Sequence, residues 1–257
     1  MRFGRIWAIA SNGFREVIRD RIFYLIGLFT LLLLLALRLL PEVAATTQDK
    51  IFLDLGLGAI ELLGVIVAVF VGTGLINKEI EKRTVLVLIP KPVTRAEFII
   101  GKHLGLSGVL AILTVATTLI YLILLSFSKI EYPLVSILVS TLYLFLKLSL
   151  LTAVALVFGV FTSSLLATLL TFGVYLMGNL SRDIVTVGNL SRNSSLESLT
   201  QNLYLFLPDL SRLNLKNEAI YGILPSPPTL LGNGAYGLFY TVLLLAIAIL
   251  IFSRREF

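Results

Sequence analysis

The chain has 257 residues and a mean hydropathy of +0.97, and 57% of its residues are hydrophobic whereas 14% are charged. Because soluble globular domains are only about 45–50% apolar, this composition excludes a soluble globule. The apolar runs are continuous over about 20 residues instead of alternating over about 10, which is typical of helices and not of a membrane β-barrel. We therefore expect an all-α integral membrane protein.

Rare and charged residues exclude several kinds of site. The chain has no cysteine and one histidine, which excludes a disulfide framework, a thiolate metal site and a histidine cluster. The net charge of +6 suggests nucleic acid at first, but in a membrane protein an excess of Lys and Arg sets the topology. We expect no metal site and no nucleic-acid partner.

Residues 1–21 combine an apolar stripe with arginines that lie off the stripe. Apolar residues recur every three to four positions, which predicts an amphipathic helix lying in the lipid headgroup plane. The stripe consists of Phe3, Ile6, Trp7, Ala10, Phe14, Val17 and Ile18. An Arg-rich start before an apolar run is also typical of a targeting sequence, but the run 22–40 is too long for a signal peptide and predicts the first spanning helix.

The short, nearly neutral stretch 41–54 is expected to be an external loop, and residues 55–76 are expected to be the second spanning helix. Its glycines allow close helix contact or local bending. Glu61 is predicted about two turns inside the bilayer, where a carboxylate costs roughly 2.5–3.5 kcal/mol. It should face the bundle interior, an aqueous cavity or a partner.

The central segment, residues 77–103, is a charged island between two apolar runs. It holds six Lys/Arg and three Glu, and a basic loop between two spanning helices is predicted to be cytoplasmic. Thr84 can cap a short helix that two prolines end, and Thr94 with Glu97 forms a capping box that starts the next helix. This pattern predicts a structured docking element and not a slack connector.

The central segment resembles the loop after the second transmembrane helix of ABC-2 type transporter permeases, in particular the multicopper-enzyme-maturation branch. The matching residues are Glu79, Glu81, Lys82, Arg83, Thr84, Leu88, Pro90, Val93, Thr94, Arg95, Glu97, Phe98, Gly101 and Lys102. In that family the loop carries a coupling helix that sits on a separate ATP-hydrolysing subunit. Many members have Gly where Arg83 stands, which distances the chain more from drug and polysaccharide exporters than from the maturation branch.

The resemblance implies a non-catalytic permease subunit of the cell inner (plasma) membrane, two copies of which pair with two ABC ATPase subunits. It implies that ATP and Mg are held by the ATPase and that this chain binds no cofactor; a periplasmic or extracellular protein is a further candidate partner. The residues expected to couple to the ATPase are Glu79, Glu81, Arg83, Thr84, Val85, Leu86, Leu88, Pro90, Thr94 and Arg95. The alternative interpretation is a basic loop that binds lipid headgroups.

Three more spanning helices are predicted before the next long polar segment. The third runs from the Thr94 capping box to about residue 126, with Gly101 and Gly105 as a small-residue contact face. His103, a lone histidine at the boundary, is interpreted as a packing or headgroup residue. The turns are 127–133 and 161–164, so the fourth and fifth helices are expected at 134–160 and 165–180.

Lys147, near the middle of the fourth helix, is the deepest charge in the sequence. A lysine there should deprotonate, snorkel or line water unless it has a partner. Glu61 is the obvious carboxylate, but at 1.5 Å per residue Lys147 is predicted roughly 10 Å deeper, which leaves a direct ion pair open. We expect Lys147 to be shielded from lipid and to face a homodimer interface or a central cavity.

The long polar segment 181–234 is expected to be external and packed on the bundle. A second capping box, Ser194 with Glu197, and leucines at helical spacing predict a helix over 196–207. The stretch 207–214 is similar to the external loop of the same permease branch. Three prolines, at 225, 227 and 228, predict an extended connection before the last span, 235–252.

Counting Lys and Arg supports six helices with both termini in the cytoplasm. The inside segments hold 13, whereas the short outside loops hold two, and long loops count little. No motif predicts chemistry of its own: Gly101 and Lys102 precede a histidine, not the Ser or Thr of a phosphate-binding loop. The alternatives to a permease are a six-helix channel or ion-coupled carrier that uses Glu61 and Lys147, and a membrane assembly scaffold.

Overall fold

The computed structural model describes residues 3–43, 47–81, 94–181, 186, 197–198, 200–202 and 207–254. Its main helices are α1 (Phe3–Val17), α2 (Phe23–Val43), α3 (Gln48–Ile66), α4 (Gly72–Glu81), α5 (Arg95–Phe127), α6 (Leu134–Phe161), α7 (Ser164–Asn179), α10 (Lys216–Tyr221) and α11 (Pro227–Arg254). Within these residues, five helices are long and apolar enough to cross a membrane, and α7 is a shorter apolar helix. The prediction of an all-α integral membrane protein is confirmed.

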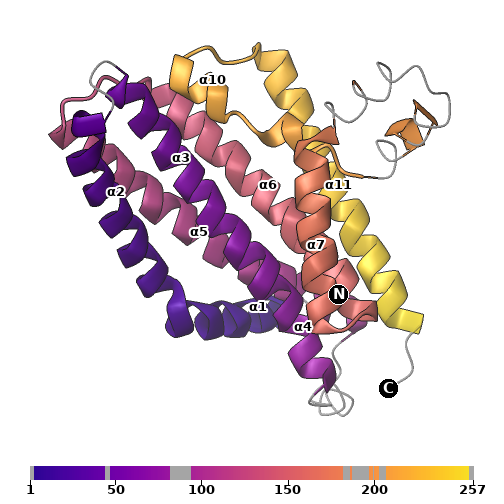
Figure 1. Ribbon diagram of the computed structural model, residues 1–257. Helices are drawn as coiled ribbons and strands as arrows, with labels where there is room; N and C mark the ends of the chain where they lie inside the picture. Colours follow the sequence, from indigo (N-terminus) through magenta and orange to yellow (C-terminus); the bar gives the residue numbers. More distant parts are fainter. Residues whose placement is uncertain are drawn as a thin grey trace.

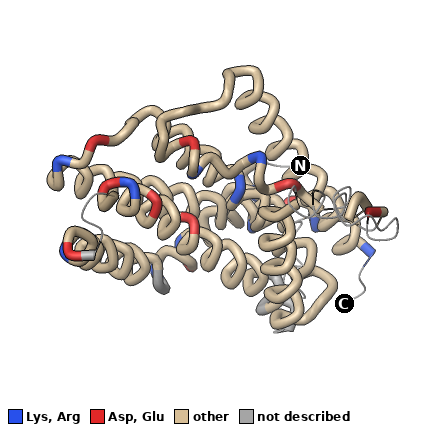
Figure 2. Tube along the Cα trace, turned by 45° about the horizontal axis from the view of Figure 1, so that its top comes forward, with Lys and Arg blue, Asp and Glu red and all other residues tan. Residues whose placement is uncertain are grey.

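The long helices lie side by side, and short helices cover the two ends of the bundle (Figure 1). α1 lies across one end, which we call the α1 end, and α10 lies at the other, the α10 end. α6 is the most buried span and contacts α3, α4, α5, α7, α10 and α11, whereas α2 and α11 expose most of their apolar surface. Most of the helical tube carries neither charge colour (Figure 2). Such apolar faces suit contact with lipid.

The second span begins earlier than its apolar run. The expected external loop over 41–54 is wrong for most of its length, because α2 continues to Val43 and α3 already starts at Gln48. Pro41 lies in the last turn of α2, where only one intrahelical hydrogen bond is lost. Asp49 lies in the first turn of α3, where a carboxylate stabilises the positive end of the helix dipole.

The same span also ends later than expected. A short π-helical stretch, Val67–Val71, joins α3 to α4, and α4 runs to Glu81. The first five residues of the central segment, 77–81, therefore continue the span. The turns after α5 and after α6 fall at 128–133 and 162–163, where the sequence predicts them.

The last span begins at Pro227 and not at residue 235, so the predicted extended connection through three prolines is wrong for two of them. Proline has no N–H, but the first N–H groups of a helix have no intrahelical acceptor, so proline fits its first turn. Ser226 stands just before the helix, with its Oγ 2.9 Å from Oγ1 of Thr229. These prolines start α11 instead of separating it from the external segment.

α1 packs against the start of α5 along the predicted small-residue face. A Cβ at Gly101 would lie 2.8 Å from Ile9 Cβ, and one at Gly105 would lie 2.7 Å from the backbone oxygen of Ala10. Trp7, on the predicted apolar stripe, stays 67% exposed. One face of α1 is therefore used for packing on α5, and an aromatic residue is left outside, as in a helix at a lipid interface.

We expect Gly105→Leu to detach α1 from the bundle, because the new side chain meets backbone and not a movable side chain. Overpacking of this kind costs about 1–3 kcal/mol. The measurement is the rate of trypsin cleavage after the exposed Arg15 in detergent, which should rise. Gly27→Leu, where a Cβ meets nothing within 4 Å, is the control, and an equal cleavage rate in both variants would contradict the prediction.

Part of the long polar segment 181–234 packs on the α10 end. Leu210 and Leu213, in the 3-10 turn Leu210–Leu213, are 0% and 1% exposed. The buried Asp209 carboxylate accepts hydrogen bonds from Ser181 Oγ and Ser211 Oγ, at 2.9 and 2.5 Å. The described stretch 207–226 is thus fixed to the bundle. The helix predicted over 196–207, with Ser194 of its capping box, lies largely outside the described residues.

Candidate functional site

Glu61 on α3 and Lys147 on α6 form an ion pair inside the bundle. Lys147 Nζ donates to Glu61 Oε1 at 2.6 Å. The lysine side chain is 1% exposed and the glutamate side chain 14%. Lys147 is therefore enclosed by the helices of its own chain and pairs directly with Glu61. That it faces a homodimer interface or a central cavity stays a prediction.

The pair can form because Glu61 and Lys147 lie at the same depth in their helices. Glu61 and Lys147 each lie 13 residues after the first residue of their helix, which places both about 20 Å from the helix start at 1.5 Å per residue. Starting α3 at residue 48 instead of 55 adds about 10 Å to the depth of Glu61. This removes the mismatch in depth that the sequence suggests.

A third helix, α7, joins the pair through Tyr175 and Asn179. Lys147 Nζ donates a second hydrogen bond to Asn179 Oδ1 at 2.6 Å, and Tyr175 Oη donates to Glu61 Oε1 at 3.0 Å. The ammonium also lies 5.4 Å from the centre of the Tyr175 ring. These four side chains, which we call the Glu61 network, connect the interior of α3 and α6 to the C-terminal end of α7.

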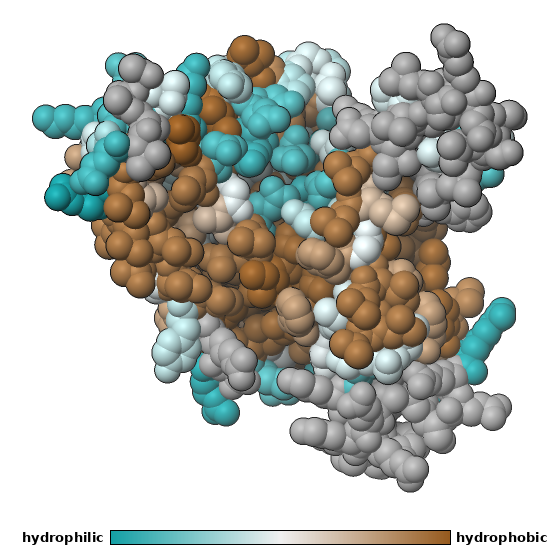
Figure 3. All heavy atoms as spheres, in the orientation of Figure 1, coloured by the Kyte–Doolittle hydropathy of each residue, from teal (hydrophilic) through white to brown (hydrophobic). Residues whose placement is uncertain are grey.

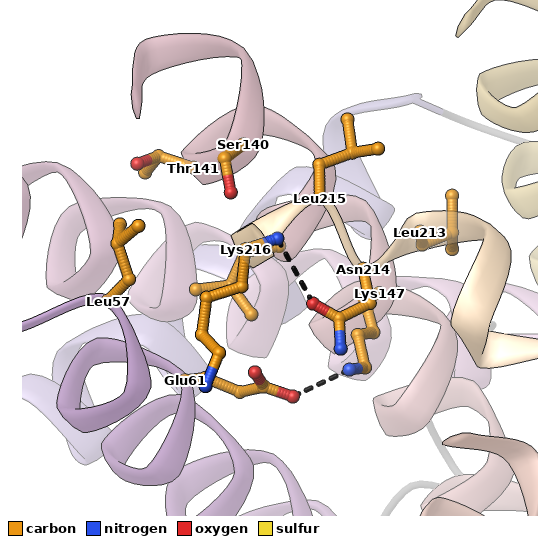
Figure 4. Close-up of a pocket in the computed structure, with 10 residues that line it drawn as sticks. Leu57, Glu61, Ser140, Thr141, Lys147, Leu213, Asn214, Leu215 and Lys216 are labelled. Atoms are coloured by element: carbon orange, nitrogen blue, oxygen red, sulfur yellow. Dashed lines mark hydrogen bonds and ion pairs between the residues drawn. The ribbon is translucent and has the colours of Figure 1, made fainter. Parts of the chain in front are cut away.

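Two members of the network, Glu61 and Lys147, line a partly polar pocket (Figure 4). The pocket is small, because the space in it that a water-sized sphere can occupy is about 10 Å³. Its polar lining residues are Glu61, Ser140, Thr141, Lys147, Asn214 and Lys216. The face shown in Figure 3 has a strip of hydrophilic residues that descends from the α10 end into the brown apolar band. The partly exposed Glu61 carboxylate is therefore connected to polar surface.

Charged residues at the mouth attach α10 to the start of α3. Lys216 Nζ lies 2.9 Å from Asp54 Oδ1, and Lys50 Nζ lies 5.0 Å from the centre of the Tyr221 ring. Both contacts are at the α10 end of α3, two to three turns from Glu61. Residues 213–216 thus line the pocket at the α10 end, and two of them, Asn214 and Lys216, are polar.

Sequence reasoning found Glu61 and Lys147 but missed Tyr175, Asn179 and Lys216. Tyr175 and Asn179 are four residues apart on α7, and Asn179 Nδ2 donates to Tyr175 O at 2.8 Å. A tyrosine and an asparagine at that spacing in an apolar helix would have been the signal, since polar groups in spanning helices usually find partners there. Lys216 had no such signal.

At the α1 end, the start of α5 has the predicted capping box. Glu97 N donates to Thr94 Oγ1 at 3.2 Å and Thr94 N donates to Glu97 Oε2 at 3.0 Å. Glu97 is 1% exposed and also lies 3.9 Å from Arg5 Nη1 of α1. This second interaction ties the amphipathic helix to the point where the chain returns from the central segment.

Arg95, the first residue of α5, reaches the last turn of α11. Its Nη1 donates to the backbone oxygens of Phe252 and Ser253 at 2.7 and 2.5 Å. Phe98 stacks on Phe252 with ring centres 5.6 Å apart. The entry of α5 and the end of α11 are therefore in direct contact.

Of the other expected coupling residues, Glu79 and Glu81 lie in the helical backbone of α4. The residues Arg83, Thr84, Val85, Leu86, Leu88 and Pro90 lie outside the described part of the chain. Their predicted roles, the short capped helix among them, remain predictions.

Among the described residues, no group of three or more His, Cys, Asp or Glu is placed to hold a metal ion. His103 is 5% exposed, and its Nε2 lies 3.0 Å from the backbone oxygen of Ser149 on α6. It packs between two spanning helices, in agreement with the interpretation from the sequence.

A family model described as "ABC-2 family transporter protein" matches residues 7–257. The match takes in every spanning helix, the central segment and the external segment. No curated protein is significantly similar to the chain.

Proposed function

The chain belongs to the ABC-2 family of transporter proteins, and from this premise we propose that it is a permease driven by ATP hydrolysis on a separate ATPase subunit. As a member of this family it is the membrane component of an ABC transporter, and the family pairs with an ABC ATPase. The observation that carries the proposal is the family match over residues 7–257. ATP and Mg belong to the partner, and this chain transmits motion.

The helices on both sides of residues 82–93 support the central segment as the coupling element. α4 is helical up to Glu81, and α5 starts with a capping box at Thr94. Twelve residues therefore connect two long helices, one of which is fixed at its first turn. An ordered element between these two helices would pass a push to the spanning helices, whereas a slack loop would absorb it.

The expected assembly is two permeases with two ATPase subunits. The excess of Lys and Arg in the central segment and near both termini supports a cytoplasmic α1 end and a plasma-membrane location. A second copy covering the pocket would keep the partly exposed Glu61 carboxylate away from lipid. In that arrangement the pocket that Glu61 and Lys147 line opens toward the interface or the cavity between the two copies.

ATP hydrolysis can drive one of two kinds of work through this permease. One is export of a small molecule or lipid, and the other is mechanical transmission to a periplasmic or extracellular protein. The resemblance of the central segment to the multicopper-enzyme-maturation branch supports the second, in the service of metalloenzyme maturation. The packed stretch 207–226 offers a fixed surface for such a partner.

The test is co-expression of the tagged chain with a candidate ABC ATPase, followed by purification and reconstitution into vesicles. We expect the ATPase to co-purify in a 1:1 ratio and to hydrolyse ATP. Replacing the phosphate-binding lysine of the ATPase should stop ATP hydrolysis while the complex stays intact. Ion flux through the purified chain alone, independent of ATP, would favour the channel or ion-coupled carrier based on Glu61 and Lys147 instead.

A further inference from the structure

The first turn of α5 and the last turn of α11 meet where the chain returns from the central segment. The two turns are more than 150 residues apart in sequence. They are joined by Arg95, whose side chain donates hydrogen bonds to the backbone oxygens of Phe252 and Ser253. The last carbonyl groups of a helix have no intrahelical donor and carry the negative end of the helix dipole. A guanidinium that donates to two of these carbonyl groups supplies the missing hydrogen-bond donors and places a positive charge at the negative end of the dipole.

Apolar packing beside Arg95 stabilises the same contact between α5 and α11. Phe252 is 2% exposed and stacks on Phe98, and its ring lies 5.9 Å from the Arg95 guanidinium carbon. Phe98 and Phe252 belong to a buried cluster that also includes Ile99 of α5 and Ala248 of α11. The end of α11 is thus held by one charged contact and by a stacked pair of aromatic rings.

We propose that Arg95 is a positioning residue that clamps the C-terminal end of α11 to the first turn of α5, so that the two move as one body. Arg95 is the first residue of α5 and lies within the Thr94–Glu97 capping box of the central segment. A displacement of that segment therefore acts on α5 and on the last spanning helix together. The consequence for ATP coupling rests on the proposed function, whereas the clamp itself does not.

This assigns Arg95 a different role from the one expected of a residue in the docking surface. A docking residue contributes to the affinity for the ATPase. A clamp decides whether a displacement of the central segment is passed from α5 to α11. Because α11 packs along α6, the displacement would then also reach the helix that carries Lys147. The two roles predict different results for the same substitution.

The first experiment measures amide hydrogen exchange of residues 250–254 in the purified permease without ATPase. For Arg95→Gln we expect exchange about tenfold faster, since a charge-assisted hydrogen bond to the last turn is lost. Arg95→Lys keeps a positive donor and should lie between Arg95→Gln and the unchanged protein. Arg254→Gln, which removes an exposed positive charge from the same turn, should stay within about twofold of the unchanged protein.

The second experiment uses the complex with the ATPase. We expect Arg95→Gln to keep the co-purified ATPase while the stimulation of ATP hydrolysis by the permease falls, with partial recovery in Arg95→Lys. Unchanged exchange at 250–254 in Arg95→Gln would overturn the clamp, and loss of ATPase binding together with unchanged exchange would assign Arg95 to docking. Faster exchange with full stimulation would overturn the role in coupling. If no ATPase binds even the unmodified chain, the proposed function fails while the exchange result still decides the clamp.

Discussion

Replacing Glu61 by leucine is expected to destabilise the permease more than replacing Lys147 by methionine, and replacing both is expected to cost least. Removing one partner of a buried ion pair typically costs about 3–5 kcal/mol, because the other charge is left without compensation. Replacing both charges by apolar groups removes that penalty. The order of the two single variants follows from the different exposure of the two side chains.

Lys147 is 1% exposed and Glu61 14%. Without Glu61, the Lys147 ammonium keeps Asn179 Oδ1 as acceptor but has no counter-charge and almost no exposed surface. Without Lys147, the Glu61 carboxylate keeps the Tyr175 hydroxyl and the pocket. The greater exposure of Glu61 lowers the cost of the second case, so Glu61→Leu should be the worse variant.

The measurement is the half-life of the folded protein in detergent at a fixed raised temperature, because membrane proteins of this size often unfold irreversibly. Thr118→Val is the matched control: its hydroxyl donates to Thr141 Oγ1 across α5 and α6 at 3.3 Å. A neutral bond of this kind in a membrane protein contributes about 0.6 kcal/mol on average. If Glu61→Leu and Thr118→Val had the same half-life, the ion pair would not be a stabilising connection.

Much of the bundle was predictable from composition and periodicity, because lipid leaves a spanning segment few alternatives to an apolar helix. The spans, the capping box at Thr94 and the glycine face of α5 all follow from local sequence. The ends of spans were less predictable where proline stands. Pro227 was interpreted as part of an extended connection, but it lies in the first turn of α11, where the missing N–H costs little.

The Glu61 network shows where local sequence stops being informative. Glu61 and Lys147 were recognisable because a charge in an apolar run is unusual. Their pairing could not be predicted, because the start of α3 was placed seven residues too late. The position of Asn179 could not be predicted either, because it depends on which side of α7 faces α6. Rotation of one helix against another is decided by side chains far apart in the sequence, so only the folded bundle reveals it.

The double variant Glu81→Ala with Arg83→Ala should weaken binding of the ATPase while the permease stays folded and inserted in the membrane. Truncating a buried polar contact at an interface costs about 1–3 kcal/mol, so two such contacts correspond to roughly 30-fold or more in the dissociation constant. Leu86→Asp should have an effect of at least that size if Leu86 fills an apolar site on the ATPase. The measurement is the amount of ATPase that co-purifies with the tagged permease, together with ATP-dependent transport.

The competing interpretation, a basic loop that binds lipid headgroups, makes the opposite prediction for these variants. Removing one negative and one positive charge leaves the net charge of the loop unchanged, so binding to anionic lipid should hardly change. Lys91→Gln serves as the matched control, because it lowers that charge without touching the expected docking residues. A permease that loses headgroup affinity with Lys91→Gln, but keeps its ATPase with Glu81→Ala and Arg83→Ala and again with Leu86→Asp, would have a lipid anchor where we place the coupling element.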